Sequence, residues 1–245
     1  MALRPASEIL TITEHRPWPV PKAPWIMQQS WCDLLFAHWP VPVEMLRPMI
    51  PERLAIDTFE GMAYVAITPF SLSLRPRGMP VMSRFPELNC RTYVEFGRKP
   101  GVFFFSLDAG SRPAVWGART FYFLPYFNAD MNARREGDEV VYSSRRASDA
   151  ASLRVRYRPT GPVRRRTKGE LAHWVTERYC LYTQRGRHLY AADIHHEPWP
   201  LQDAACEMEE NTIAASRGIR LPDVAPLLHY SAALDVLIWP LRQIG

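Results

Sequence analysis

Glycine and paired cysteines are scarce in this chain of 245 residues. The 12 glycines are outnumbered by 23 prolines. Because proline interrupts helix interiors, this balance argues against a helix bundle and favours short strands joined by loops. The four cysteines lie far apart and form no CxxC pair, which argues against a thioredoxin-like redox motif and a zinc knuckle.

Long apolar runs and the common catalytic signatures are also missing. No apolar stretch approaches the ~20 residues of a membrane-spanning helix, and the N-terminus lacks the continuous apolar segment of a signal peptide. We therefore expect a soluble, cytoplasmic protein without membrane contacts. The chain has no Gly-rich phosphate loop, GxSxG elbow or HExxH motif, so we expect neither a cofactor nor a metal.

What remains is an ordinary globular composition, with 47% hydrophobic and 22% charged residues. Residues 1–28 are rich in proline and predict an extended N-terminal arm. The rest shows no repeat, low-complexity tract or linker, so we expect residues 29–245 to form a single domain. Its strand-like segments outnumber its helical ones, which predicts an α+β, mainly β fold with a few peripheral helices.

Several segments of strand-like composition are separated by turn residues. We expect strands over residues 31–38, 61–70, 89–97, 102–107, 139–143, 153–157, 179–183 and 188–194. Three helices are expected: a short one over residues 42–49, one after the capping box at residues 167–170, and the clearest over residues 202–217. Gly218 is expected to end the last helix in a left-handed conformation.

Basic residues are concentrated between residues 134 and 168, where eleven of them accompany only four acidic residues. Such a patch can contact an anionic partner such as nucleic acid. However, Leu153, Val155 and Tyr157 alternate with three arginines, as expected for a strand with one buried and one solvated face. No nucleic-acid-binding motif accompanies the patch, so the solvated strand is favoured and nucleic acid remains an alternative.

A row of polar side chains follows one face of the strand expected near residue 90. Asn89, Arg91, Tyr93 and Glu95 alternate with smaller or apolar residues, so all four point to the same side. That side is either exposed to solvent or the lining of a polar cavity, and the pattern leaves both interpretations open. In a cavity, Arg91 would bind a carboxylate bidentately and Glu95 would set its orientation.

Residues 116–127 are dense in aromatic side chains. Such a run is typical of a hydrophobic core. It also carries hydrogen-bonding groups on Arg119, Tyr122, Tyr126 and the adjacent Asn128. Polar tips in apolar surroundings are the mixture that small-molecule pockets use, so these residues are candidates for a binding site.

His195, His196 and Glu197 form a short cluster of metal-ligand types, followed by Trp199 between two prolines. In an extended segment His195 and Glu197 would share a face while His196 points away. Zinc sites need three or four ligands, and no further ligand is evident nearby. A structural or pocket-lining role is therefore favoured over a metal site.

Five segments along nearly the whole chain resemble the YqjF-like family of bacterial proteins of unknown function: residues 16–19 (RPWP), 34–39 (LLFAHW), 85–89 (FPELN), 176–182 (TERYCLY) and 195–200 (HHEPWP). That family is similar to a branch of the acetoacetate decarboxylase-like superfamily, with more distant matches over residues 46–57, 107–125 and 196–199. The resemblance implies an antiparallel cone or partly closed β-barrel with the active site inside, often in homo-oligomers. It also places the superfamily's pocket glutamate within two residues of Asn89.

This sequence differs from the acetoacetate decarboxylases at the position of their reactive lysine amine. Acetoacetate decarboxylases form an imine between a lysine and the substrate ketone, and that lysine pair follows a proline. Here the residues after Pro125 are Tyr126 and Phe127, and neither forms an imine. The chain has three lysines in all, each in an arm, a turn or a helix cap. The sequence therefore argues against Schiff-base decarboxylation.

These features predict a protein that keeps the cavity and has lost the imine chemistry. It would bind an acidic or polar organic compound through Arg91 and Arg119, with Asn89 orienting the ligand. Tyr122, Tyr126 and Trp199 would form the apolar wall.

If the protein is an enzyme, Tyr126, Glu95 and His195 are the candidate proton-transfer groups of a lyase- or hydrolase-like reaction. Tyrosine has an ordinary pKa near ~10, so Tyr126 would need a neighbouring cation such as Arg119 to act at neutral pH. Two alternatives remain open: a non-catalytic scaffolding protein whose interior is filled by aromatic rings, and contact with anions or nucleic acid through residues 134–168.

Overall fold

The computed structural model describes residues 3–245, and its main feature is one 13-stranded sheet. The strands are β1 (Met27–Val41), β2 (Ala55–Ile56), β3 (Ala63–Pro76), β4 (Phe85–Phe96), β5 (Lys99–Ala109), β6 (Tyr126–Glu136), β7 (Glu139–Arg146), β8 (Ser152–Pro159), β9 (Cys180–Arg185), β10 (His188–His196), β11 (Gln202–Asn211), β12 (Leu227–Ile238) and β13 (Arg242–Ile244). The helices are α1 (Ala6–Ile9), α2 (Val43–Leu46), α3 (Arg112–Phe121) and α4 (Leu171–Thr176), with 3₁₀ turns η1 (Arg47–Met49) and η2 (Ala215–Arg217). The expected mainly β fold with few helices is confirmed.

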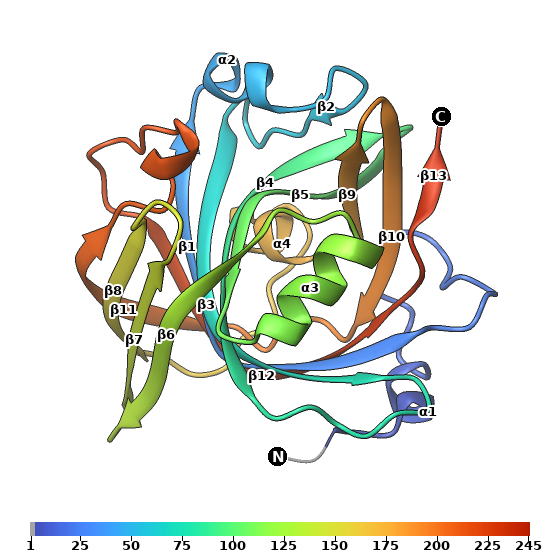
Figure 1. The fold of residues 1–245 in the computed structure, drawn as a ribbon, viewed down its shortest axis with the longest axis horizontal. Helices are drawn as coiled ribbons and strands as arrows, with labels where there is room; N and C mark the ends of the chain where they lie inside the picture. Colours follow the sequence, from blue (N-terminus) through green and yellow to red (C-terminus); the bar gives the residue numbers. More distant parts are fainter. Residues whose placement is uncertain (1–2) are drawn as a thin grey trace.

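Seven strands pair in a circuit that returns to its start. The order is β1, β12, β10, β9, β5, β4 and β3, and β3 pairs again with β1. Helix α3 crosses the front of this circuit in Figure 1, and α4 lies behind it. The β5–β9 and β5–β6 pairings are parallel, so the expectation of a wholly antiparallel sheet is wrong at these two places.

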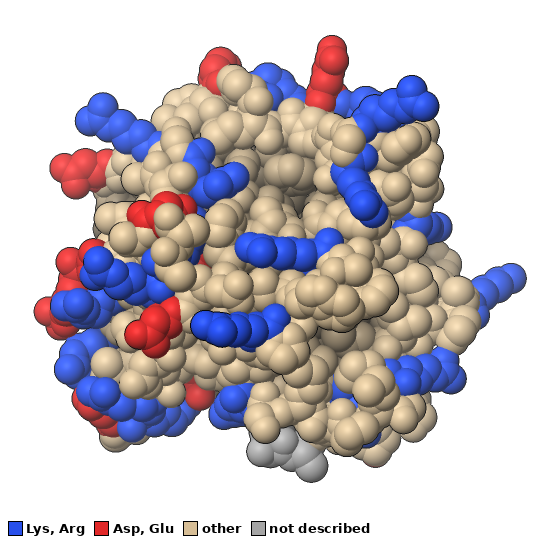
Figure 2. Space-filling model, in the orientation of Figure 1, with Lys and Arg blue, Asp and Glu red and all other residues tan. Residues whose placement is uncertain are grey.

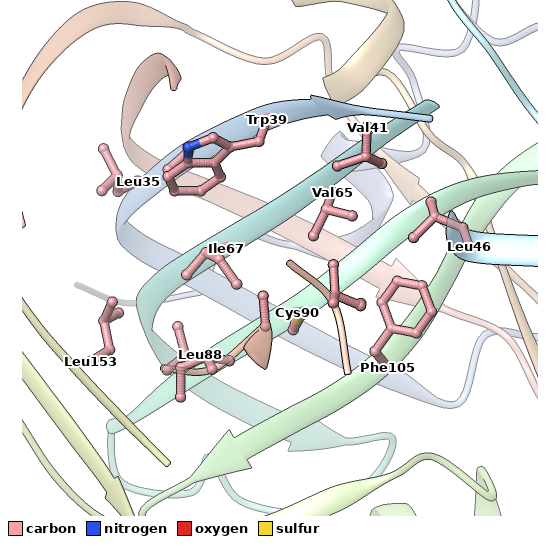
Figure 3. Packing of buried hydrophobic residues seen from close by; sticks show 14 of the residues in the cluster. Leu35, Trp39, Val41, Leu46, Val65, Ile67, Leu88, Cys90, Phe105 and Leu153 are labelled. Atoms are coloured by element: carbon pink, nitrogen blue, oxygen red, sulfur yellow. The ribbon is translucent and has the colours of Figure 1, made fainter. Parts of the chain in front are cut away.

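The strands of the circuit bury both faces. On β4, Leu88 and Cys90 pack in one core with Val65 and Ile67 of β3, as Figure 3 shows. The alternate residues of β4 point to the other side, where a second core lies. Side chains alternate across a strand, so this one strand contributes to two different environments.

Strand β8, which carries the alternating arginines, has one buried and one exposed face, as the alternation predicts. Leu153, Val155 and Tyr157 of β8 are buried, while the intervening arginines are partly or fully exposed. Those arginines form ion pairs with Glu136 and Glu139 and with acidic residues of β11. Figure 2 shows basic and acidic side chains interleaved on this side of the molecule. The exposed arginines are thus partly neutralised, which favours the solvated strand over a nucleic-acid surface.

The prediction of a helix over residues 202–217 is wrong. Residues Gln202–Asn211 form β11, which pairs with β8, and only the short η2 follows. Glu207 lies opposite Arg156 and Glu210 opposite Arg154, so cross-strand charge pairing accompanies the ladder. Gly218 does adopt the expected left-handed conformation, with φ of 76°. The helical spacing of apolar residues was overridden by pairing with a distant strand.

Helix α3 was not expected from the sequence, where the aromatic run at residues 116–127 covers only its C-terminal part. Ser111 precedes the helix in an extended conformation, and Pro113 lies in its first turn. Proline at this position lacks only an N–H that has no partner in any helix, and this pattern is the local sign of the helix start. Among residues 3–245 no helix is long and apolar enough to cross a membrane.

Gly101 lies where β5 passes closest to β9. A Cβ atom placed on it would lie 2.6 Å from the carbonyl oxygen of Cys180 and 2.7 Å from a ring carbon of Tyr182. We therefore expect Gly101→Ala to lower the free energy of unfolding by about 1–3 kcal/mol through overpacking. Chemical denaturation measures this change.

Gly117 in α3 is the matched control, because a Cβ there meets no atom within 4 Å. Gly117→Ala should raise stability by up to about 1 kcal/mol, since alanine favours the helix. Equal stabilities for the two variants would show that the β5–β9 approach is not tight.

Candidate functional site

A cavity of about 550 Å³ lies within the circuit of strands, a size typical of small-molecule sites. Its walls come from the inner faces of β1, β3, β4 and β5 and from helix α3. Most of the lining is apolar, with side chains such as Trp31, Phe70, Leu72 and Leu107. The interior is therefore not filled by the protein's own aromatic rings.

Two members of the polar row on β4, Asn89 and Arg91, point into this cavity, together with Glu87. Glu87, Asn89 and Arg91 all line it, and they are only 4%, 6% and 8% exposed. This face of β4 is therefore enclosed at Asn89 and Arg91, whereas Glu95 near the end of the strand is partly exposed. The opposite face of β4 packs in the other core, which fixes the strand's orientation.

Arg91 is buried without a charge partner. Within residues 3–245 no carboxylate lies within ion-pair distance of its guanidinium, and its Nε has no hydrogen-bond partner. Its guanidinium carbon lies 5.4 Å from the centre of the Phe36 ring. Burying an unpaired charge in apolar surroundings is costly, so this arrangement points to a ligand that supplies the missing negative charge.

Further unpartnered polar atoms line the same cavity. Arg178 donates from Nε to the carbonyl of Trp174 and pairs through Nη1 with Asp57, but its Nη2 is buried without a partner. The indole Nε1 of Trp199 and the side-chain oxygen of Asn89 are also unpartnered among the described residues. Because buried polar groups are normally hydrogen-bonded, these atoms are available to a bound molecule.

Glu87 and Tyr126 form a hydrogen-bonded pair in the cavity wall. The Tyr126 hydroxyl donates to Glu87 Oε2 at 3.0 Å. Burial raises the pKa of Glu87 to about 8 and that of Tyr126 well above its ordinary value. Both groups hold their protons at neutral pH, so the Glu87 carboxyl is the more acidic proton source of the two.

Sequence reasoning did not single out Glu87. It lies two residues before Asn89 and therefore on the same face of β4. Extending the alternation by one step would have found it, and the superfamily resemblance had placed a glutamate within two residues of Asn89.

The structure brings five of the eight sequence-predicted site residues to this cavity: Asn89, Arg91, Tyr122, Tyr126 and Trp199. The Tyr122 hydroxyl donates to the carbonyl of Trp239 at 3.2 Å, so its ring is fixed in the wall. The Trp199 ring stacks on Trp31 with centroids 5.7 Å apart. These contacts hold the aromatic wall in place.

Arg119 lies outside the cavity. Its Nε donates to the backbone carbonyl of Tyr126 at 2.7 Å, and its side chain lines a separate open groove of about 800 Å³ beside Phe123 and Arg185. Figure 2 shows a hollow with basic side chains at its border on this face. The phenol of Tyr126 therefore contacts Glu87 rather than a cation, and its pKa is raised rather than lowered.

Glu95 and His195 are also placed elsewhere. Glu95 is partly exposed near the end of β4, opposite Ala55. The His195 ring faces the N-terminal segment, with Nε2 2.9 Å from the carbonyl oxygen of Ile9 and Nδ1 3.2 Å from Arg16. The neighbouring His196, which points to the opposite side of β10, lines the cavity instead of the predicted His195.

Both histidines are uncharged at neutral pH, because burial lowers the pKa of His195 to about 4 and that of His196 to about 3. Within residues 3–245 no cluster of three or more potential metal ligands is found. None of the three lysines lines the cavity. Lys99 pairs with Asp193 at 2.5 Å, and Lys22 and Lys168 are exposed.

Comparison with known proteins shows the family of this chain. A model of the DUF2071 family, an uncharacterized conserved protein, matches residues 28–235. The chain belongs to this family. It is 50% identical over 229 residues to the uncharacterized protein YqjF of Bacillus subtilis (strain 168), covering 91% of this chain and 95% of that protein. The YqjF-like resemblance is thus confirmed.

Solved structures share the fold of this DUF2071 chain. Acetoacetate decarboxylase from Legionella pneumophila aligns with a TM-score of 0.61 at 12% identity, covering 95% of this chain and 93% of that one. The enduracididine biosynthesis enzyme MppR complexed with pyruvate gives the same values. An acetoacetate decarboxylase-like enzyme from Sphingomonas wittichii RW1 aligns with a TM-score of 0.61 at 12% identity over 94% of this chain and 98% of that one. Identity this low shows the fold alone, and the predicted likeness of fold to acetoacetate decarboxylase is confirmed at that level.

Proposed function

We propose that the protein binds an organic acid inside a cone-like shell of strands, with the ligand carboxylate held by Arg91. The buried, unpaired Arg91 is the observation that carries this proposal. A carboxylate would provide the missing charge and accept the fork of guanidinium donors. The MppR structure with pyruvate is a precedent for a small acid in this fold.

The neighbouring groups support a carboxylate rather than a neutral ligand. Arg178 Nη2 and Trp199 Nε1 are further unpartnered donors, and Asn89 supplies an unpartnered acceptor for a second polar group of the ligand. Arg91 brings an unpaired positive charge to the cavity, while the charge of Arg178 is paired with Asp57. Glu87, the acidic side chain among the lining residues, is neutral at pH 7. The cavity is therefore electrostatically suited to an anion.

Any turnover in this cavity would use Glu87 rather than a lysine. The Glu87 carboxyl carries a proton near neutral pH and is positioned by the Tyr126 hydroxyl, as a general acid requires. No lysine amine lines the cavity, so an imine route has no nucleophile there. A lyase- or hydrolase-like reaction driven by proton donation is the enzymatic form of this proposal.

Equilibrium binding of carboxylates and their matched neutral amides tests the proposal. We expect the acids to bind and Arg91→Gln to weaken them about 10- to 100-fold, because a charge-assisted pair is lost. Arg154→Gln, which removes the same charge from the exposed face of β8, should leave binding unchanged. Equal affinity for acid and amide, or full affinity in Arg91→Gln, would refute the role of Arg91.

Cytoplasmic localisation and homo-oligomer formation stay predictions. The filled-shell alternative is disfavoured by the volume of the cavity. Contact with nucleic acid through residues 134–168 is disfavoured by the ion pairs on β8.

A further inference from the structure

The cavity has a polar end and an apolar end, and the lining side chains of β4 change from polar to apolar between them. Arg91, Asn89 and Glu87 follow one another at every second residue, and Phe85 comes next in the lining. At about 3.3 Å per residue, Arg91 and Phe85 lie about 20 Å apart along the strand. The polar groups therefore occupy the part of the cavity away from Phe85.

The neighbouring strands repeat this order. On β3, Thr68 lies opposite Asn89 and Leu72 lies opposite Phe85, and Leu74 and Pro76 continue the lining. Strand β1 adds Trp31 opposite Leu72 and, farther out, Met27 opposite Pro76. Beyond the level of Phe85 the walls are almost wholly apolar.

The charged side chains Arg91 and Arg178 lie at the end of the cavity opposite Phe85. Arg178 lies with its guanidinium carbon 4.8 Å from the centre of the Tyr93 ring, and Tyr93 is two residues beyond Arg91 on β4. The ring of Phe36 contacts both Arg91 and Trp199. A carboxylate bound here would have its carbon chain directed along β4 toward Phe85.

The apolar end opens to solvent through an apolar rim. Four lining residues are unusually exposed for their type: Ile26 at 38%, Met79 at 59%, Trp116 at 65% and Phe121 at 63%. They come from the start of β1, the loop before β4 and helix α3. The loop at residues 77–84 and the first turn of helix α3 contain three arginines and no acidic residue, so this side of the mouth attracts an anion.

We infer that the ligand is an elongated amphipathic carboxylate, an acid with an alkyl chain, whose head lies at Arg91 and whose tail runs to the mouth between residues 77–84 and α3. This inference rests on the proposed function and names its ligand class. A small polar acid would satisfy Arg91 but leave the apolar walls in contact with water. An alkyl chain removes that surface from water along the whole cavity.

Saturated carboxylates from butanoate to dodecanoate test the inference by isothermal titration calorimetry. We expect affinity to rise about fourfold for each added methylene throughout the series, because even dodecanoate is shorter than the distance from Arg91 to Phe85. If butanoate binds in an Arg91-dependent way and longer chains bind no tighter, the inference fails while the proposed function stands. If no carboxylate in the series binds, both fail.

Gly117→Leu tests the path of the tail. Gly117 lines the cavity on α3, and a Cβ there meets no atom within 4 Å, so a side chain can start from this position and narrow the mouth. Circular dichroism checks that the variant is folded. We expect octadecanoate, whose chain is long enough to reach the mouth, to bind about tenfold more weakly and butanoate to bind as in the unmodified protein. Unchanged octadecanoate affinity would overturn the route past α3.

Discussion

Replacing Arg146 with methionine is expected to lower the free energy of unfolding by about 3–5 kcal/mol, because it leaves a buried carboxyl without its partner. Both side chains of the Arg146–Asp108 pair are 0% exposed, and Nε donates to Asp108 at 2.6 Å. Nη1 also donates to Ser216 at 2.9 Å, and the guanidinium carbon lies 4.4 Å from the centre of the Phe127 ring. One substitution thus removes several contacts that join β5, β7 and η2.

The double variant Arg146→Met, Asp108→Leu separates the ion pair from simple packing. It removes both charges together, so it should recover a large part of the stability lost in the single variant. Urea denaturation of the three proteins at pH 7 measures both steps. A loss below about 1 kcal/mol in Arg146→Met would mean that the pair does not stabilise the junction.

Glu87→Gln is expected to change how stability depends on pH. Burial raises the pKa of Glu87 from 4.5 to about 8, so the folded protein keeps a proton that the unfolded chain has lost. Stability from this group is present below pH 4.5 and is lost as pH rises toward 8, by about 1.4 kcal/mol per pH unit. Glutamine has no proton to lose, so the variant should lack this decline.

The interval from pH 6.5 to 8 isolates the effect. The pKa values of His195 and His196 are lowered to about 4 and about 3, so both rings are largely uncharged in the folded and the unfolded chain above their ordinary pKa near 6.5. Across this interval the stability of Glu87→Gln relative to the unmodified protein should rise by about 2 kcal/mol. Glu95→Gln controls for the loss of one acidic side chain from β4, and parallel curves for Glu87→Gln and the unmodified protein would contradict the raised pKa.

Local patterns in the sequence predicted the elements whose partners are adjacent in the chain. The β9–β10 hairpin and the short helix after Pro42 follow from nearby turn residues, and the alternation in β8 gave its buried face. Strand β11 was missed because its identity depends on β8, which lies about 50 residues earlier. Apolar residues with helical spacing could not reveal that partner.

Only part of the candidate site could be predicted, because local patterns do not reveal contacts between distant segments. Period-two alternation placed Asn89 and Arg91 on one face, but only the tertiary structure shows that this face is enclosed. The prediction that Arg119 lines the cavity was wrong because the sequence analysis did not predict helix α3. Arg119 lies in the last turn of this helix and lines the separate groove. His195 was proposed as a proton-transfer group, but its ring contacts Ile9 and Arg16 of the N-terminal segment, which no local pattern reveals, and His196 lines the cavity instead.

A crystal structure of the protein with bound octanoate tests the central claim most directly. We expect the carboxylate oxygens to lie within hydrogen-bond distance of the Arg91 guanidinium, with the chain extending toward Phe85. Octanoate bound only in the groove beside Arg119, or in the cavity with its carboxylate away from Arg91, would contradict the claim.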